Sequence, residues 1–122
     1  MRKIQIAILI VFSIVTYSAC RHETDIDSLP DLTYEKDIKI IISSNCASKN
    51  GCHGTDPQSE FPLTTYEEVM DECEVEPGNA HGSKLYEVIT TEGEDKMPPE
   101  QDLDDKDIKR IFIWILKGAK KE

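Results

Sequence analysis

The sequence predicts an all-α fold, a single small domain of helices joined by loops. Three observations support this class. Apolar residues recur every three to four positions in several stretches, which is the spacing of one helix face. Capping residues precede those stretches, and glycine and proline gather between them. No stretch is clearly a strand, and 122 residues leave room for one domain.

The first 19 residues have the features of a signal peptide. Arg2 and Lys3 precede an apolar run over residues 4–17, and small residues follow it. The run is shorter than the roughly 20 residues that cross a bilayer as a helix, which favours a removable signal over an uncleaved anchor. We therefore expect residues 1–19 to direct export and to be removed.

Residues 20–32 are expected to form a lipid-anchored tether. Ser18, Ala19 and Cys20 resemble the lipobox of bacterial lipoproteins, in which the cysteine carries the lipid, and a polar segment with one proline follows. The resemblance implies a protein of the cell envelope, anchored in the membrane at Cys20 and facing the periplasm. Arg21, where an aspartate could stand, favours the outer membrane by the same resemblance.

The charge of the exported part limits its partners. The chain has a net charge of -10, and removal of residues 1–19 takes away Arg2 and Lys3 and no acidic residue, which leaves -12. Nucleic acid is not expected as a partner, because phosphate binding requires a basic face. A basic partner protein would be attracted to this surface, although solubility alone also explains the charge.

The domain is expected over residues 33–122, and its first half contains two predicted helices. Thr33 can cap a helix over residues 34–44 that leads directly to Cys46. A loop with glycine and proline follows over residues 47–63. Thr65 and Glu68 then form a capping-box pattern before a short helix that ends near Cys73. The apolar face of the first helix contains Tyr34, Ile38, Ile41 and Ile42.

The second half contains a turn over residues 77–82, a short helix that Ser83 can cap, and an irregular loop over residues 91–102. The last helix is the clearest, because Asp104 is a good N-cap and Gly118 a good stop. Its expected buried stripe contains Ile108, Ile111, Phe112 and Ile115, with Trp114 at one flank. A helical domain this small has a thin core and often needs a disulfide, a metal or a cofactor to be stable.

The stretch from Cys46 to Gly54 ends in Cys-His-Gly, as a covalent haem site does, but five residues separate Cys46 from Cys52. Haem attachment uses two thiols that add to the vinyl groups and a histidine that binds the iron, and the usual spacing is two residues. The intervening Ser48, Lys49, Asn50 and Gly51 tolerate an exposed bulge. A stretched haem motif, a disulfide loop and a metal site therefore all stay open.

Met97 is a candidate for the second axial ligand of a haem iron. It precedes Pro98 and Pro99 in a loop directly before the last helix. A residue before proline is pushed toward extended geometry, which could hold the thioether in one direction. Methionine ligation raises the reduction potential of a haem, and we therefore favour a ligand role over a role as gap filler.

Several stretches in a fixed order resemble the small cytochrome c domains of exported proteins from Bacteroidota and Planctomycetes. They cover roughly residues 36–119 and run in the order DIKIIISSNCASKNGCHG, PLTTYEEV, PGNAHGSKLYEVI, KMPP and LDDKDIKRIFIWILKGA. The resemblance implies a cytochrome c-like small helical domain in which the first and last helices cross beside one covalently attached haem c. Trp114 and Phe112 would pack at that crossing.

The same resemblance assigns the site residues. Cys46 and Cys52 would be the thioether attachment points, His53 the proximal iron ligand and Met97 the distal ligand. His81 is a rival distal ligand, although its place in a turn favours a surface role. Met70 lies on a helix face, where a core role is expected.

Cys73 is the third cysteine of the domain, and three cysteines cannot all pair within one chain. It could be a free thiol beside a doubly attached haem, or it could pair with Cys46 while Cys52 alone holds the haem. A Cys46–Cys52 disulfide without haem is a third possibility. A zinc site of Cys46, Cys52, His53 and Cys73 is a remote fourth.

The sequence thus predicts an electron carrier rather than an enzyme, because methionine ligation would close the sixth position of the iron. Its partner would be an unidentified redox protein. The alternative from another class is a disulfide-stabilised lipoprotein that binds or scaffolds without haem. A haem sensor or peroxidase-like domain with a labile distal ligand is a further possibility.

Overall fold

The structure is a computed structural model that describes residues 25–48, 52–57, 59 and 61–122. The predicted signal peptide, the lipidation site Cys20 and the start of the tether lie outside the described residues. The described part contains four α-helices with short helical turns and no strand, so the all-α prediction is confirmed. Within it, no helix is both long enough and apolar enough to span a bilayer.

The first predicted helix is present, but it begins with a wider turn. Residues Tyr34–Ile38 (η2) form a π-helical turn that continues into α2, Lys39–Asn45. The expected side-chain cap is not made, because the Thr33 hydroxyl is buried without a hydrogen-bond partner. Instead, the Thr33 backbone N–H donates to the Asp37 carboxylate at 2.9 Å.

The helix α3, Tyr66–Glu72, begins as predicted with a complete capping box. The Glu68 N–H donates to the Thr65 hydroxyl at 3.2 Å, and the Glu68 carboxylate accepts from the Thr65 N–H at 2.9 Å. This exchange satisfies two of the backbone donors that a helix start leaves free. Helix α3 therefore begins at a position that its own sequence specifies.

Two helical segments follow, η3 (Ala80–Gly82) and α4 (Lys84–Thr90). Ser83 stands at the N-cap of α4 but does not cap it with its side chain. Its buried hydroxyl accepts from the Glu76 N–H and donates to the Asn79 carbonyl, both at 2.9 Å. Ser83 therefore closes the preceding turn, while α4 begins without a side-chain cap.

The last helix, α5, spans Asp105–Leu116 with the predicted cap at Asp104, whose carboxylate accepts from the Lys106 N–H at 2.8 Å. Gly118 follows with a φ of +100°, the left-handed conformation that ends a helix. The predicted buried stripe is partly wrong. Trp114 is fully buried at the centre of the core instead of at a flank, whereas Ile108 and Phe112 are only half-buried.

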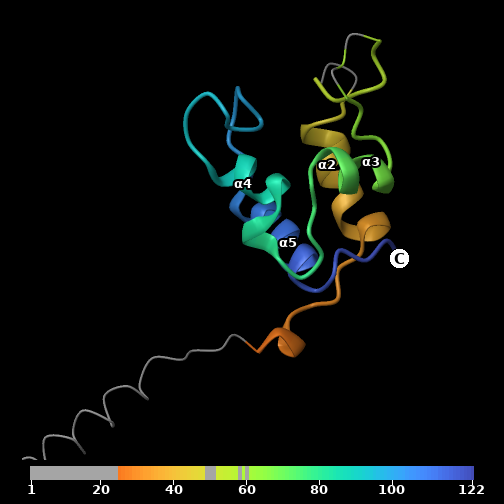
Figure 1. Cartoon of the computed structure of the whole chain (residues 1–122), viewed down its shortest axis with the longest axis vertical. Coiled ribbons are helices and arrows are strands. Elements are labelled where there is room, and N and C mark those ends of the chain that lie inside the picture. Colours follow the sequence, from red (N-terminus) through yellow and green to blue (C-terminus); the bar gives the residue numbers. More distant parts are fainter. Residues whose placement is uncertain (1–24, 49–51, 58, 60) are drawn as a thin grey trace, which may run out of the picture.

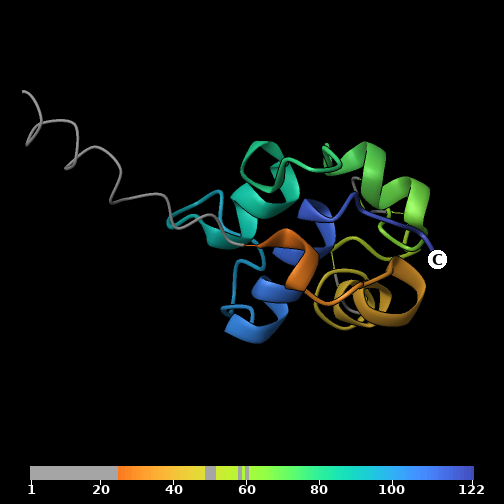
Figure 2. The same cartoon turned by 90° about the horizontal axis from the view of Figure 1, so that it is seen from below.

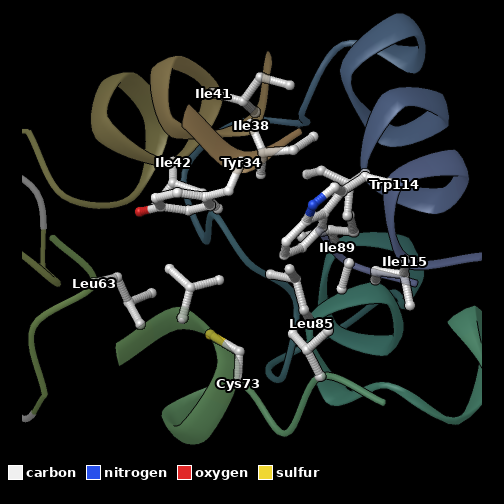
Figure 3. Close-up of a cluster of buried hydrophobic side chains, with 14 of the residues drawn as sticks. Tyr34, Ile38, Ile41, Ile42, Leu63, Cys73, Leu85, Ile89, Trp114 and Ile115 are labelled. Atoms are coloured by element: carbon white, nitrogen blue, oxygen red, sulfur yellow. The ribbon is translucent and has the colours of Figure 1, made fainter. Parts of the chain in front are cut away.

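The helices form two halves around one core. Helices α2 and α3 lie on one side, and α4 and α5 on the other, in both views (Figures 1 and 2). Tyr34 from η2 and Trp114 from α5 meet between the halves, with ring centroids 6.2 Å apart. Figure 3 shows these two rings side by side, with Ile38 and Ile41 above them and Leu85 and Ile89 of α4 below. Trp114 therefore packs where the first and last helices meet, as expected.

Phe112 does not join that meeting point. Its ring lies 5.2 Å from the ring of Tyr86 and 5.4 Å from that of His81. The prediction for Phe112 is therefore wrong. The helix turns this residue toward α4 and η3, on a face different from that of Trp114.

The segment after α5 ties the two halves together. The Lys120 carbonyl accepts from the Tyr34 N–H and from the Trp114 indole N–H, both at 2.9 Å. The Ala119 carbonyl accepts from the Tyr66 hydroxyl at 2.9 Å. Tyr34, Tyr66 and Trp114, which we call the aromatic trio, thus share one backbone segment, which accepts from the Tyr34 backbone N–H and from the side chains of Tyr66 and Trp114.

The last residues of the predicted tether contact the domain. A short turn, η1 (Ile26–Ser28), precedes them. The Lys117 ammonium donates to the Leu29 carbonyl at 2.8 Å and pairs with the Asp31 carboxylate at 2.9 Å. Lys117 holds the pKa of Asp31 below its usual value. The boundary at residue 32 stays a prediction, and the chain before it is held at the end of α5.

Candidate functional site

The loop that follows α2 and the loop that follows α4 rise at the same end of the molecule, opposite the end where the tether enters (Figure 1). Between them lies an open cavity of about 320 Å³. All four predicted haem-site residues of the domain, Cys46, Cys52, His53 and Met97, line it. The structure therefore brings together side chains that come from opposite halves of the chain.

Helix α2 delivers Cys46 to the cavity. Cys46 is the C-cap residue of α2, and its N–H donates to the Ile42 carbonyl at 2.8 Å. The His53 N–H donates back to the Cys46 carbonyl at 3.1 Å, which closes the loop between them. The five residues between Cys46 and Cys52 therefore do not keep the His53 backbone away from Cys46. Residues 49–51, the centre of the predicted bulge, lie outside the described residues.

The His53 ring is oriented by the loop that follows it. Its Nδ1 lies 3.2 Å from the Phe61 carbonyl oxygen, and the two rings stack with centroids 4.5 Å apart. The Leu63 N–H also donates to the His53 carbonyl at 2.8 Å. A carbonyl at Nδ1 favours the tautomer with the proton on Nδ1, which leaves Nε2 with a lone pair for a metal.

Met97 lines the cavity from the loop that follows α4. Its N–H donates to the Val88 carbonyl near the end of α4 at 2.8 Å. The Met97–Pro98 peptide bond is cis, and the neighbouring Lys96 pairs with Asp102 at 2.5 Å. The Met97 side chain is 36% exposed, so its thioether is available at the cavity.

The donor set of this cavity fits a covalently bound haem. Two thiols, an imidazole with an oriented ring and a thioether are the groups that attach and ligate haem c. The described residues contain no group of three or more metal-ligating His, Cys, Asp or Glu side chains. The remote zinc alternative is therefore wrong for this arrangement, since its four residues do not gather around one point.

The cysteines differ in burial. Cys52 is exposed, Cys46 is half-buried and Cys73 is buried in the core. Burial raises the pKa of the Cys46 thiol to about 11. It raises the pKa of the Cys73 thiol to about 12, with smaller contributions from the neighbouring charges of Cys46 and Glu72. Both thiols are therefore protonated and weakly reactive at neutral pH in the folded domain.

His81 does not lie at this cavity. It is exposed beside a separate cavity of about 380 Å³ that Tyr86 and Phe112 also line. Its ring packs edge-on against those of Tyr86 and Phe112, at 5.3 and 5.4 Å. The structure thus does not bring His81 to His53. Met70 is half-buried against the core, which confirms its expected role.

Some contributors to the site carry no signal in the sequence. Phe61 orients His53 through its backbone carbonyl, and Val88 anchors Met97 in the same way. A carbonyl group is present in every residue, so only the folded chain shows which one is used. Ser44 and Asn45, at the end of α2, and Glu100 and Gln101, beyond the prolines, also line the cavity.

Comparison with known proteins adds one finding. A family described as Planctomycete cytochrome C matches residues 50–101, which is less than half of the chain. The matched stretch contains Cys52, His53 and Met97 and begins after Cys46. No curated protein and no solved structure matches the chain. The match and the helical fold together support a cytochrome c-like domain, for which the family suggests haem binding and electron transfer.

Proposed function

We propose that this protein is a c-type cytochrome that carries single electrons in the cell envelope. The observation that carries the proposal is the cavity that a Cys-His pair from one loop and a methionine from another loop line together. The family match over residues 50–101 supports the same function.

Each residue of the cavity has a role in this proposal. Cys52 would hold one haem c through a thioether bond, and the family resemblance assigns a second bond to Cys46. His53 would ligate the iron through Nε2, because Nδ1 is directed at the Phe61 carbonyl. Met97 would supply the second axial ligand from the loop that follows α4.

We propose a carrier and not an enzyme, because His53 and Met97 together would fill both axial positions. Bound haem c supplies a one-electron couple, and Met/His ligation raises its potential. The chain's own contribution is to hold the two ligands apart on two anchored loops. The exposed Cys52 and the partly exposed Met97 put the mouth of the cavity at the surface, where a redox partner protein could approach.

The proposed location follows from the sequence before the domain. Residues 1–19 would direct export, and lipid at Cys20 would anchor the protein in the membrane, with the outer membrane favoured. The strongly acidic chain argues against nucleic acid as a partner.

The test is production of the full chain in a host with haem-attachment machinery. We expect a red protein that keeps its haem on a denaturing gel, and we expect Cys52→Ala to lose that haem. A colourless protein in which two of the three domain cysteines are joined by a disulfide would overturn the proposal and favour the binding lipoprotein.

The distal ligand is tested in the same protein by two matched variants. Met97→Leu should lower the reduction potential by a clear fraction of the roughly 0.8 V that axial ligation spans. Met70→Leu changes the same residue type in the core on α3, and the potential should stay unchanged. His81→Ala should also leave it unchanged. An unchanged potential in Met97→Leu would instead favour a sensor or peroxidase-like domain.

A further inference from the structure

We infer that Cys46 and Cys73 form a disulfide in the mature protein, which joins the end of α2 to the end of α3. The consequence for haem rests on the proposed function: attachment would then use Cys52 alone. The inference departs from the double attachment that the family resemblance assigns.

The two residues occupy equivalent places on neighbouring helices. Cys46 is the C-cap residue of α2, and Cys73 is the C-cap residue of α3. Cys73 belongs to the buried core with 8% exposure, and Cys46 packs against that same core. Both cysteines thus contact the same core, at the ends of α2 and α3.

Helical register points Cys46 toward that side. Cys46 follows Ile42 by four residues, so the two share one face of α2. Figure 3 shows Ile42 and Tyr34 above the inward-turned side chain of Cys73. Cys46 is therefore the last residue on the face of α2 that is turned toward Cys73.

Electrostatics agree with this placement. After burial, the charge of Cys46 is a smaller cause of the raised pKa of the Cys73 thiol. Of the two cysteines in the haem-like motif, Cys46 is the one that packs against the core to which Cys73 belongs.

The two cysteines of the haem-like motif also differ in how exposed they are. Cys52 is exposed at the cavity, where its thiol is accessible, whereas Cys46 is half-buried at the junction of cavity and core. The hydrogen bond from the His53 N–H to the Cys46 carbonyl keeps His53 in place without a thioether bond at Cys46. A cavity with one accessible thiol next to its histidine is sufficient for single attachment.

The reaction balances with an external disulfide as the oxidant. Two thiols, Cys46–SH and Cys73–SH, lose two protons and two electrons and form one Sγ–Sγ bond, while the external disulfide gains them and yields two thiols. Since only the thiolate reacts, and burial keeps both groups protonated in the folded domain, the bond is expected to form before the core closes. The same burial would then protect it from reduction.

The experiment maps all three cysteines in the red, full-length protein. The denatured protein is alkylated without reduction and cleaved after Lys49 and Tyr66, which puts the three cysteines on separate peptides. We expect the Cys46 and Cys73 peptides to be joined and to separate on reduction, with haem on the Cys52 peptide. Cys46 and Cys52 peptides joined through one haem, with Cys73 alkylated, would overturn the inference.

The outcomes also separate this inference from the proposed function. A colourless protein with the Cys46–Cys73 link and an alkylated Cys52 would keep the disulfide and remove the cytochrome. A Cys46–Cys52 link would overturn both, as would three alkylated cysteines without haem.

Two variants provide a second, independent readout. Under single attachment, Cys46→Ser keeps haem on a denaturing gel, and the absorption maximum of its pyridine complex, which reports the number of thioether bonds, does not move. Cys73→Ser should behave in the same way. A shift of that maximum in Cys46→Ser alone would show that Cys46 holds haem and would overturn the inference.

Discussion

Tyr34 shows how one residue can serve both packing and electrostatics. Its ring is 1% exposed and meets Tyr66 at 5.4 Å and Trp114 at 6.2 Å between the two halves of the domain. Burial, followed by the negative charge of Glu35 and other acidic neighbours, raises the pKa of its hydroxyl to about 12. The folded state therefore favours the neutral, protonated form of the Tyr34 hydroxyl.

We expect Tyr34 to weaken the fold at alkaline pH. The unfolded chain ionises this tyrosine near pH 10 and the folded chain near pH 12, so stability is full below pH 10 and falls above it. The loss should reach about 2 to 3 kcal/mol by pH 12. Urea unfolding at pH 8 and pH 11 measures it, with Tyr34→Phe as the control that lacks this loss. Equal losses in the two proteins would contradict the assignment.

The site residues themselves illustrate what a sequence can predict. His53 and Met97 could be selected because their chemistry and their neighbours are local features. Cys73 could not be assigned, since the choice of a partner depends on where the ends of α2 and α3 lie in the folded chain. The same holds for the Phe61 carbonyl, which orients His53.

At the scale of the elements, the predicted helix caps are present where the capping side chain and its backbone partner lie within one turn of the same helix. The capping box of Thr65 and Glu68 and the cap at Asp104 were predicted and are present. Thr33 and Ser83 also precede helices, but neither side chain caps one. Ser83 bonds to Glu76 and Asn79 instead, because the preceding turn brings those backbone groups closer.

The two threonines give a matched test of capping. Replacement of Thr65 by valine keeps the shape of the side chain and removes its bond to the Glu68 N–H, so the free energy of unfolding should fall by about 1 kcal/mol. Thr33→Val removes a buried hydroxyl that has no partner, and stability should stay equal or rise. Thermal or urea unfolding of both variants compares them. A loss in Thr33→Val as large as that in Thr65→Val would refute this reading.

At the scale of the whole molecule, the halves are joined by a segment that no helix contains. Backbone carbonyls of Ala119 and Lys120 satisfy all three members of the aromatic trio. The family resemblance implied that the first and last helices meet, but nothing in the sequence indicated that the chain after α5 returns to bond with η2 and α3. Bonds between distant backbone groups leave no periodic trace in a sequence.

Deletion of residues 119–122 should therefore destabilise the whole domain. It removes the acceptors of the Tyr34 N–H, the Trp114 indole and the Tyr66 hydroxyl, at about 1 kcal/mol each. We expect a loss of about 3 kcal/mol or more in urea unfolding, together with a red shift of Trp114 fluorescence. Deletion of Glu122 alone is the control and should have little effect. Comparable stability in the two proteins would show that the segment is dispensable.

The bond of Lys117 to Leu29 and Asp31 determines how far an anchored domain could travel. If Cys20 were anchored, the nine residues from Cys20 to Leu29 would span at most about 30 Å. The domain would then stay within about its own diameter of the surface that holds it. The two loops that line the cavity lie at the opposite end of the domain from the entering chain (Figure 1), so a membrane-bound partner would have to reach around the domain to meet the cavity.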